Sequence, residues 1–282
     1  MTVLEAIQKT AAFFAARGIE SARLQAELLL AHVLQQPRMR LYLSFDRVLT
    51  GPEVDAFREL VRRRGQREPL QHLLGSVSFC GLELAVGPAA LIPRPETEEL
   101  ARLGWEFLSA RPEPVALDWG TGTGCLAIAI AIHCPAATVV AVDLSEPALE
   151  LARANLARHQ LQNRVNCLAS DGFAAVPAGM QFDLLVSNPP YIATAEIAAL
   201  QPEVRDHDPR LALDGGTDGL DVFRRLAAEA APWLKPDGRI MLEFGDGQAG
   251  AVSEIFTGQN WVVEAVVEDY SRRSRFLVAR RT

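Results

Sequence analysis

Two patterns of hydrophobic and polar positions divide the chain. Through the first 66 residues, apolar side chains recur at the spacing of amphipathic helices. The predicted helices cover Val3–Ala16, the stretch from a Ser21 cap through Val33, Met39–Leu43, and a segment starting at Pro52. Thr50 and Glu53 have the spacing of a capping box before the last of these helices. The pattern therefore predicts a small all-helical N-terminal domain over residues 1–66.

Residues 67–95 have a different composition. The runs "VSF" and "LELAV", separated by "CG", are typical of a short β-hairpin. The following "GPAALIPRP" contains too many prolines for regular structure. We predict a linker that contains a β-hairpin.

From residue 96 to residue 282, short apolar runs alternate with helical patterns. Strands are predicted at Val115–Asp118, Thr138–Asp143, Val165–Ala169, Phe182–Ser187, Arg239–Glu243, Val262–Val267 and Arg275–Ala279. Helices are predicted at Thr97–Ala110, Cys125–His133, Pro147–His159, Leu220–Leu234 and Gln248–Phe256. Continuous apolar strands separated by helices indicate an α/β fold, a doubly wound, Rossmann-like sheet covered on both faces. The last two of the seven strands lack a helix between them, so we expect the last strand to be antiparallel.

Composition excludes several classes of protein. Hydrophobic residues make up 49% of the chain and no apolar window is long enough to span a membrane, so we expect no membrane association. The first residues have helical periodicity and do not resemble a signal peptide. The four cysteines and five histidines lack the spacing of a disulfide framework or a metal site. We expect a cytoplasmic protein without a metal. A net charge of −7 gives no general attraction to phosphate backbones, so no stable nucleic-acid partner is expected.

A glycine-rich turn follows the first strand of the sheet, in "LDWGTGTGCLAIAIA". Such a turn lets the backbone approach a nucleotide-like ligand closely, although it could also be a plain tight turn. Gly120, Gly122 and Gly124 are at positions one, three and five of the loop, whereas the dinucleotide fingerprint places its third glycine at position six. Asp143, at the end of the next strand, is suited to accept both hydroxyl protons of a ribose. A helix N-cap is its alternative role, but Ser145 suits that role better.

After the third strand, "SDGF" offers a second cofactor contact. Asp171 could accept a hydrogen bond from an adenine amine and Phe173 could pack on the base, or both could belong to an ordinary loop. These residues leave a nicotinamide-dependent enzyme possible.

The fourth strand ends in "LLVSNPPYI", at the edge of the sheet where ligands bind. Two prolines make a rigid exit from the strand, which is a structural role in itself. The side-chain carbonyl of Asn188 and the backbone carbonyl of Pro189 could also hold the two N–H groups of a planar amide or aryl amine. The nitrogen would then face an electrophilic methyl, and positioning would supply most of the catalysis. Tyr191 would offer an apolar wall to the flat group.

At this point the sequence resembles the class I S-adenosylmethionine-dependent methyltransferases, with "GTGTG" as the cofactor loop and "NPPY" as the amino-methylating signature. "NPPY" is shared by enzymes that act on glutamine amides, adenine amines and guanine amines. "EPLQHLLGSVSFCGLELAVGPAALIPRPETEEL", with its "IPRPETE" signature, and "DPRLALDGGTDGLD" resemble segments of the peptide chain release factor N5-glutamine methyltransferases, the PrmC/HemK family. The resemblance covers essentially the whole chain.

The resemblance implies methyl transfer from S-adenosyl-L-methionine to the side-chain amide of the glutamine in the Gly-Gly-Gln motif of class I release factors. The product of the cofactor would be S-adenosyl-L-homocysteine. Residues 1–66 would recognise the substrate, and the enzyme would act as a monomer. The implied catalytic residues are Asn188 and Pro189, and the implied substrate-binding residues are Asn188, Pro189, Pro190 and Tyr191. The implied cofactor-binding residues are Gly120, Thr121, Gly122, Thr123, Gly124, Asp143, Asp171, Gly172, Phe173 and Asn188.

Two further expectations concern the borders of the site. Arg94, Pro95, Glu96 and Thr97 of the linker signature would lie beside it. Some family members carry an aromatic residue immediately after the aspartate of the third-strand loop, where this chain has Gly172. Phe173 would then take the aromatic role.

Three other functions compete with this interpretation. An N-methyltransferase acting on an exocyclic base amine would need base flipping and a basic groove, which the acidic charge and the linker disfavour. A non-catalytic binding module would not need an intact "NPPY". A dinucleotide oxidoreductase is disfavoured by the glycine spacing.

Overall fold

The computed structural model describes residues 1–282, which form two compact units. One unit consists of Met1–Ser76 together with Gln201–His207, and the other consists of Val77–Leu200 together with Asp208–Thr282.

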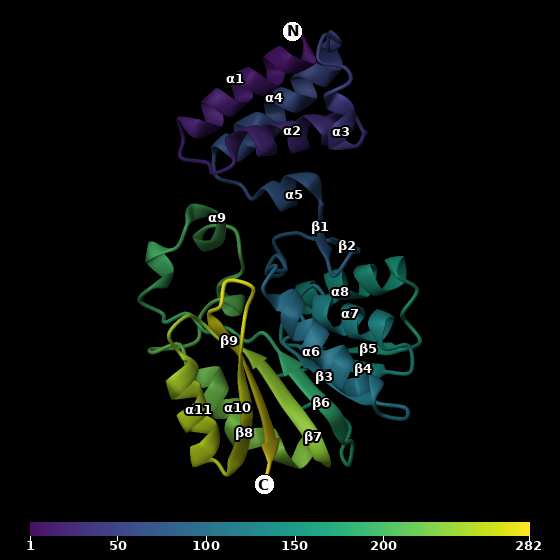
Figure 1. Ribbon diagram of the computed structural model, residues 1–282, viewed down its shortest axis with the longest axis vertical. Helices are drawn as coiled ribbons and strands as arrows, with labels where there is room; N and C mark the ends of the chain where they lie inside the picture. The colour runs from purple at the N-terminus through teal and green to yellow at the C-terminus, as the bar shows by residue number, and fades with distance from the viewer. The chain divides into compact units, whose positions relative to one another are not determined.

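The first unit is built from helices (Figure 1). Its helices are α1 (Val3–Ala15), α2 (Ala22–Val33), α3 (Arg38–Leu41), α4 (Gly51–Gly65), α5 (Leu70–Leu74) and the distant α9 (Pro202–Arg205). Glu203 of α9 accepts hydrogen bonds of 2.7 Å from both Arg64 and Arg67, next to the end of α4. Burial alone would raise the pKa of Glu203, but these hydrogen bonds lower it below its usual range. The pair of ion pairs therefore ties α9 to the N-terminal helices.

Two details of this unit differ from the sequence prediction. Ser21 does not cap α2, because its φ of 49° is left-handed and its side chain makes no hydrogen bond to the helix. An N-cap needs an extended backbone for its oxygen to reach the first turn. The short α5 was not predicted, since five residues between Pro69 and Gly75 are too few to show periodicity. The predicted hairpin is confirmed as β1 (Ser76–Phe79) and β2 (Leu82–Ala85).

The second unit contains a seven-stranded sheet with the order β5-β4-β3-β6-β7-β9-β8. Its strands are β3 (Val115–Trp119), β4 (Thr138–Asp143), β5 (Val165–Ala169), β6 (Phe182–Ser187), β7 (Leu234–Glu243), β8 (Trp261–Glu268) and β9 (Ser274–Arg281). The pairs from β5 to β7 are parallel, and β9 is antiparallel to both β7 and β8. The predicted doubly wound sheet with an antiparallel last strand is therefore confirmed (Figure 1).

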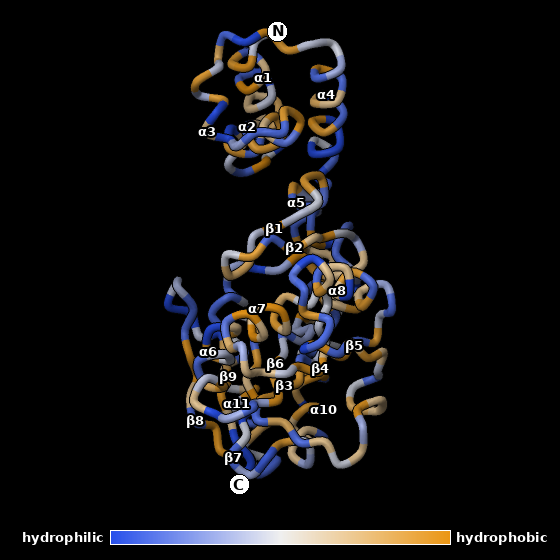
Figure 2. The backbone as a smooth tube through the Cα atoms, turned by 90° about the vertical axis from the view of Figure 1, so that its right-hand side faces the viewer, coloured by the Kyte–Doolittle hydropathy of each residue, from blue (hydrophilic) through white to orange (hydrophobic).

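Alternating side chains of the strands bury two separate cores. Ala116 and Leu184 belong to the core under α6 (Thr97–Ser109), α7 (Cys125–His133) and α8 (Glu146–Arg158). Leu117 and Leu185 belong to the core under α10 (Asp221–Glu229) and α11 (Ala249–Gly258) on the opposite face. Because neighbouring residues of a strand point to opposite faces, both must be apolar, and Figure 2 shows β3 in hydrophobic colour. This explains why the strands appear in the sequence as continuous apolar runs.

One predicted helix ends early. The pattern predicted Leu220–Leu234, but α10 ends at Glu229 and a 3-10 turn covers Ala231–Trp233. Pro232 lacks the N–H that an α-helix needs and disfavours helical backbone at the residue before it. The chain consequently enters β7 at Leu234, earlier than the predicted Arg239.

The parallel strands place their carboxyl ends at one edge of the sheet. Trp119 of β3 is in register with Val142 of β4, and Asp118 is in register with Val186 of β6. The glycine loop, Asp143 and Asn188 each follow directly from one of these strand ends. No helix of the structure is long and apolar enough to cross a membrane.

Candidate active site

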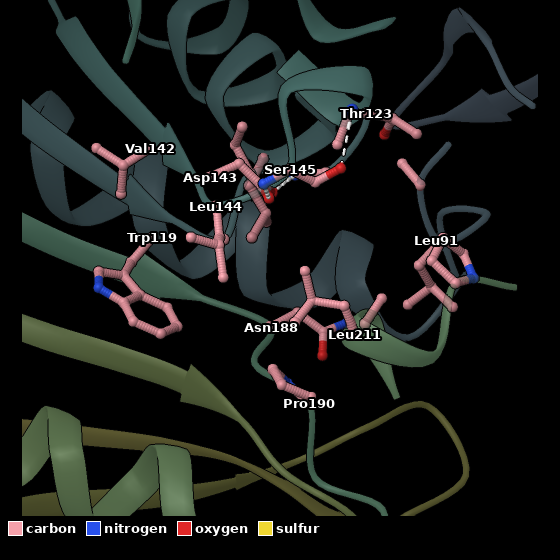
Figure 3. A pocket seen from close by; sticks show the side chains of 18 of the residues that line it. Leu91, Trp119, Thr123, Val142, Asp143, Leu144, Ser145, Asn188, Pro190 and Leu211 are labelled. Atoms are coloured by element: carbon pink, nitrogen blue, oxygen red, sulfur yellow. Dashed lines mark hydrogen bonds between the residues drawn. The ribbon is translucent and has the colours of Figure 1, made fainter. Parts of the chain in front are cut away.

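A cavity of about 290 Å³ lies at this edge, which is close to the smallest size of typical small-molecule sites. Figure 3 shows Trp119, Leu144, Asn188 and Leu91 around one open space. The loops after β3, β4, β5 and β6 all contribute to its wall, as do the linker before α6 and the segment after residue 208. The cavity therefore brings together the segments that carry the sequence motifs.

The glycine loop lines the cavity through residues 120–123. Gly120, Gly122 and Gly124 have φ values of 73°, 56° and 83°, a left-handed region that favours glycine. The backbone N–H groups of Gly120 and Thr121 donate to the carbonyl of Val142 at 2.9 Å. The loop is thus fixed against β4, and a Cβ at Gly120 would point into open space rather than into protein.

Asp118 supports this loop from below, a role that sequence reasoning missed. Its Oδ2 accepts hydrogen bonds from Thr121 Oγ1 at 2.6 Å and from the N–H of Ala127 at 3.1 Å. Burial raises the pKa of Asp118 to about 7. Its position near the end of a buried strand, two residues before Gly120, was the available signal.

Asp143 faces the cavity with both carboxylate oxygens already oriented. Oδ2 accepts the N–H of Gly122 at 2.8 Å and Oδ1 accepts the N–H of Ser145 at 2.9 Å. A carboxylate has about four lone-pair positions, so each oxygen keeps one for a ligand hydroxyl. Ser145 caps α8 by accepting the N–H of Ala148 at 3.3 Å, which confirms its predicted cap. Loop and carboxylate together fit a ribose-containing cofactor.

The loop after β5 differs from the prediction. Asp171 and Gly172 line the cavity, and Arg225 donates to Asp171 Oδ1 at 2.6 Å. Phe173 does not line it: its ring is 6% exposed and stacks on Trp233 with 5.3 Å between centroids. In this structure the left-handed backbone at Gly172 is followed by a ring that packs in the core, so the cofactor role predicted for Phe173 gains no support from the geometry.

Apolar walls come from residues that the sequence did not single out. Trp119 and Leu144 both line the cavity, and Leu144 is 57% exposed although it is apolar. Trp119 ends β3, directly before the glycine loop, and Leu144 directly follows Asp143 at the end of β4. An exposed leucine beside Asp143 is therefore a surface that a bound cofactor would cover.

The "NPPY" residues divide between the cavity and the core. Asn188 and Pro190 line the cavity, whereas Pro189 and Tyr191 do not. The Pro189 carbonyl accepts no backbone hydrogen bond, although Pro189 itself is buried. Tyr191 packs on the core around α10 and α11, and burial raises its pKa above the usual range. Its predicted role as a wall for the substrate is thus not visible in this geometry.

The linker signature and the segment after "NPPY" meet at the cavity rim. Arg94 and Thr97 line the cavity, as do Pro209, Leu211 and Asp214. Arg94 donates to the buried carboxylate of Asp208 at 2.6 Å, and Ile192 pairs with Asp214 in an isolated bridge. Pro95 and Glu96 do not line the cavity.

Both units of the protein resemble known protein families. Residues 5–75 match the family model described as PrmC N-terminal domain, and residues 101–215 match the methyltransferase small domain. Among solved structures, the ribosomal protein L11 methylase from Lactobacillus delbrueckii subsp. bulgaricus is similar in fold. Its TM-score is 0.51 at 20% identity, over 67% of this chain and 80% of that chain.

Two curated relatives cover nearly the whole chain. A release factor glutamine methyltransferase from Geobacter sulfurreducens is 46% identical over 258 residues, 91% of this chain and 88% of the relative. One from Mycolicibacterium smegmatis is 44% identical over 282 residues, 98% of this chain and 96% of the relative. With this identity over the full length, and with the glycine loop, Asp143 and Asn188 at one cavity, the chain belongs to the family of release factor glutamine methyltransferases.

Proposed function

We propose that this protein transfers a methyl group from S-adenosyl-L-methionine to a glutamine of class I release factors. The acceptor is the side-chain amide nitrogen of the glutamine in their Gly-Gly-Gln motif. The observation that carries this proposal concerns Asn188, which lines the cavity: its amide nitrogen donates to Thr97 at 3.1 Å, while no protein donor binds its Oδ1. A free carbonyl oxygen at this edge is what a substrate N–H requires.

The residues that would hold the cofactor are the glycine loop, Asp143 and the apolar side chains of Trp119 and Leu144. When bound, S-adenosyl-L-methionine supplies an electrophilic methyl group and leaves as S-adenosyl-L-homocysteine. Asp143 would accept ribose hydroxyls, and the loop backbone would lie against the rest of the ligand.

Asn188 and Pro189 would position the substrate. The Asn188 side-chain carbonyl and the Pro189 backbone carbonyl each accept one N–H of the glutamine amide. With both N–H groups held, the lone pair of the nitrogen is directed at the methyl carbon. An amide nitrogen is a weak nucleophile, and orientation of this kind can supply up to about 7–11 kcal/mol in the best cases. The amide proton becomes acidic only as the new N–C bond forms, so no strong base is required.

We also propose that the helical N-terminal part, residues 1–66, recognises the release factor. Three of its apolar side chains are strongly exposed: Met39 at 65%, Leu43 at 88% and Val48 at 66%. Exposed apolar side chains on a small domain are available for a protein partner to cover.

The test is incubation with labelled S-adenosyl-L-methionine and either a purified class I release factor or nucleic acid, followed by mass spectrometry. The proposal expects one methyl on the glutamine of the Gly-Gly-Gln motif, and expects Asn188→Ala to slow its formation strongly while leaving a measurable residual rate. Label in nucleic acid alone would instead support the base N-methyltransferase.

A further inference from the structure

Three residues from distant parts of the sequence form a chain of hydrogen bonds beside the cavity. Asn188, after β6, donates from Nδ2 to Thr97 Oγ1 at 3.1 Å. Thr97 begins α6, and its hydroxyl donates to Oε2 of Glu243, the last residue of β7, at 2.7 Å. These hydrogen bonds therefore link the proposed substrate-binding amide of Asn188 to the buried carboxylate of Glu243.

Burial makes these contacts exclusive. Thr97 and Glu243 are each 2% exposed, so water does not compete for either side chain. A buried polar group without a partner is costly, and the Thr97 hydroxyl and the Glu243 carboxylate each have a partner among these three residues. Only Asn188 reaches the cavity with an oxygen that has no protein donor.

The single hydroxyl proton of Thr97 gives the chain a direction. A carboxylate can only accept, so the proton of Thr97 goes to Glu243. The Thr97 oxygen then has only lone pairs left for Asn188, and only the NH₂ group of Asn188 can donate to it. The amide is thereby fixed with Oδ1 turned away from Thr97. A rotation of the amide by 180° would place Oδ1 against the Thr97 oxygen, where neither atom carries a proton.

We propose that Thr97 and Glu243 are positioning residues for methyl transfer: they select the one orientation of the Asn188 amide in which Oδ1 can accept an N–H of the substrate. This inference rests on the proposed function, and it deepens the role of Asn188. It assigns to Thr97 a specific task in place of general proximity to the site. It also brings in Glu243, which lies on a strand that carries no sequence motif.

The test compares Thr97→Val with Thr97→Ser in the full-length protein. Valine keeps the shape of threonine without the hydroxyl, whereas serine keeps the hydroxyl. We expect kcat to fall about 10- to 100-fold in Thr97→Val, the size of a lost orienting contact, with serine restoring most of it. The dissociation constant for S-adenosyl-L-homocysteine, measured by calorimetry, should stay within about twofold of wild type, because the ribose site is untouched.

A double-mutant cycle separates positioning from general structural damage. If Thr97 acts through Asn188, then Thr97→Val should lower kcat little further in an Asn188→Ala background. An equal loss in both backgrounds, or a Thr97→Val enzyme with wild-type kcat, would overturn the proposal. If wild type methylates nucleic acid rather than release factor, the proposed function fails, and the same variants test the positioning role on that acceptor.

A spectroscopic measurement makes the test independent of turnover. In ¹⁵N-labelled protein, the two side-chain N–H resonances of Asn188 should be well separated and one should exchange slowly with solvent. In Thr97→Val the two resonances should move together and both should exchange fast, while Thr97→Ser should keep the wild-type pattern. Identical Asn188 resonances in wild type and Thr97→Val would contradict the proposal.

Discussion

Arg225 fills the space that a side chain at Gly172 would need. A Cβ built at Gly172 would lie 2.5 Å from Nη2 of Arg225, and Gly172 has a left-handed φ of 62°. The same guanidinium holds Asp171 at 2.6 Å and lies 5.9 Å from the ring centroid of Trp119. Arg225 thus forms the cavity wall beside Gly172, the position at which some family members carry an aromatic residue.

We predict that Gly172→Ala weakens cofactor binding by moving Arg225. A direct comparison is Gly179→Ala, since Gly179 has a similar φ of 83° but open space around its Cβ. Both substitutions should cost about 1–2 kcal/mol of folding free energy for the left-handed backbone. Only Gly172→Ala should raise the dissociation constant for S-adenosyl-L-homocysteine in calorimetry. Equal affinities in the two variants would show that Arg225 has no part in the cofactor site.

Replacement of Asp143 should weaken cofactor binding more strongly. Asp143→Asn keeps one acceptor oxygen but loses the charge, so either the N–H of Gly122 or a ribose hydroxyl loses its acceptor. Charge-assisted hydrogen bonds contribute about 1.5–3 kcal/mol, which corresponds to an affinity loss of about 10- to 150-fold. Glu146→Gln is the control, because Glu146 carries the same charge nearby but does not line the cavity. A wild-type affinity in Asp143→Asn would exclude the ribose role.

Phe173 should matter for stability and not for the cofactor. Its ring stacks on Trp233 in the core, and such stacking is worth about 0.5–1.5 kcal/mol beyond burial. We expect Phe173→Leu to lower the free energy of unfolding in urea by at least this amount. Affinity for S-adenosyl-L-homocysteine should be unchanged. A selective loss of affinity at unchanged stability would restore the cofactor role that the sequence suggested for Phe173.

Local patterns were sufficient to predict most of the fold. The strands of the sheet are continuous apolar runs because both of their faces are buried, and this pattern does not depend on distant residues. Where prediction failed, the cause was backbone geometry that residue types alone do not reveal. Ser21 is a common cap residue in a left-handed conformation, and Pro232 ended a helix whose apolar spacing continued past it.

The site was predictable only where a motif lies in one stretch of sequence. The glycine loop, Asp143 and Asn188 each follow a strand end, so parallel topology implied that they meet. Thr97 belongs to the linker signature and Glu243 ends β7, but nothing in the sequence indicated that these two residues pair, since the pairing depends on β7 lying beside β6 and on α6 packing against both strands. The place of the Phe173 ring could not be predicted for a similar reason: whether a loop aromatic faces a ligand or a core is decided by side-chain packing.

The pKa of Glu243 leads to a final prediction on pH. Burial raises it from 4.5 to about 7, against the opposing effects of Thr97, Arg275 and Tyr191, while Glu96 raises it further. The folded protein thus binds this proton more tightly than the unfolded chain does. The contribution of Glu243 to the free energy of unfolding should therefore fall as the pH rises from 4.5 to about 7 and stay constant above that.

Activity should follow the opposite course. Below about pH 7 a protonated Glu243 can donate its proton to the Thr97 oxygen. The Thr97 hydroxyl can then donate to Asn188, which reverses the direction of the hydrogen bonds and lets the Asn188 amide turn Oδ1 toward Thr97. With saturating cofactor, kcat should rise with pH through a single ionisation near 7. Glu243→Gln cannot ionise, so its kcat should be low and flat across this range. If kcat of Glu243→Gln still rose with pH as it does in wild type, the ionisation would belong to another group. Asp118 is one such group, because burial also raises its pKa to about 7.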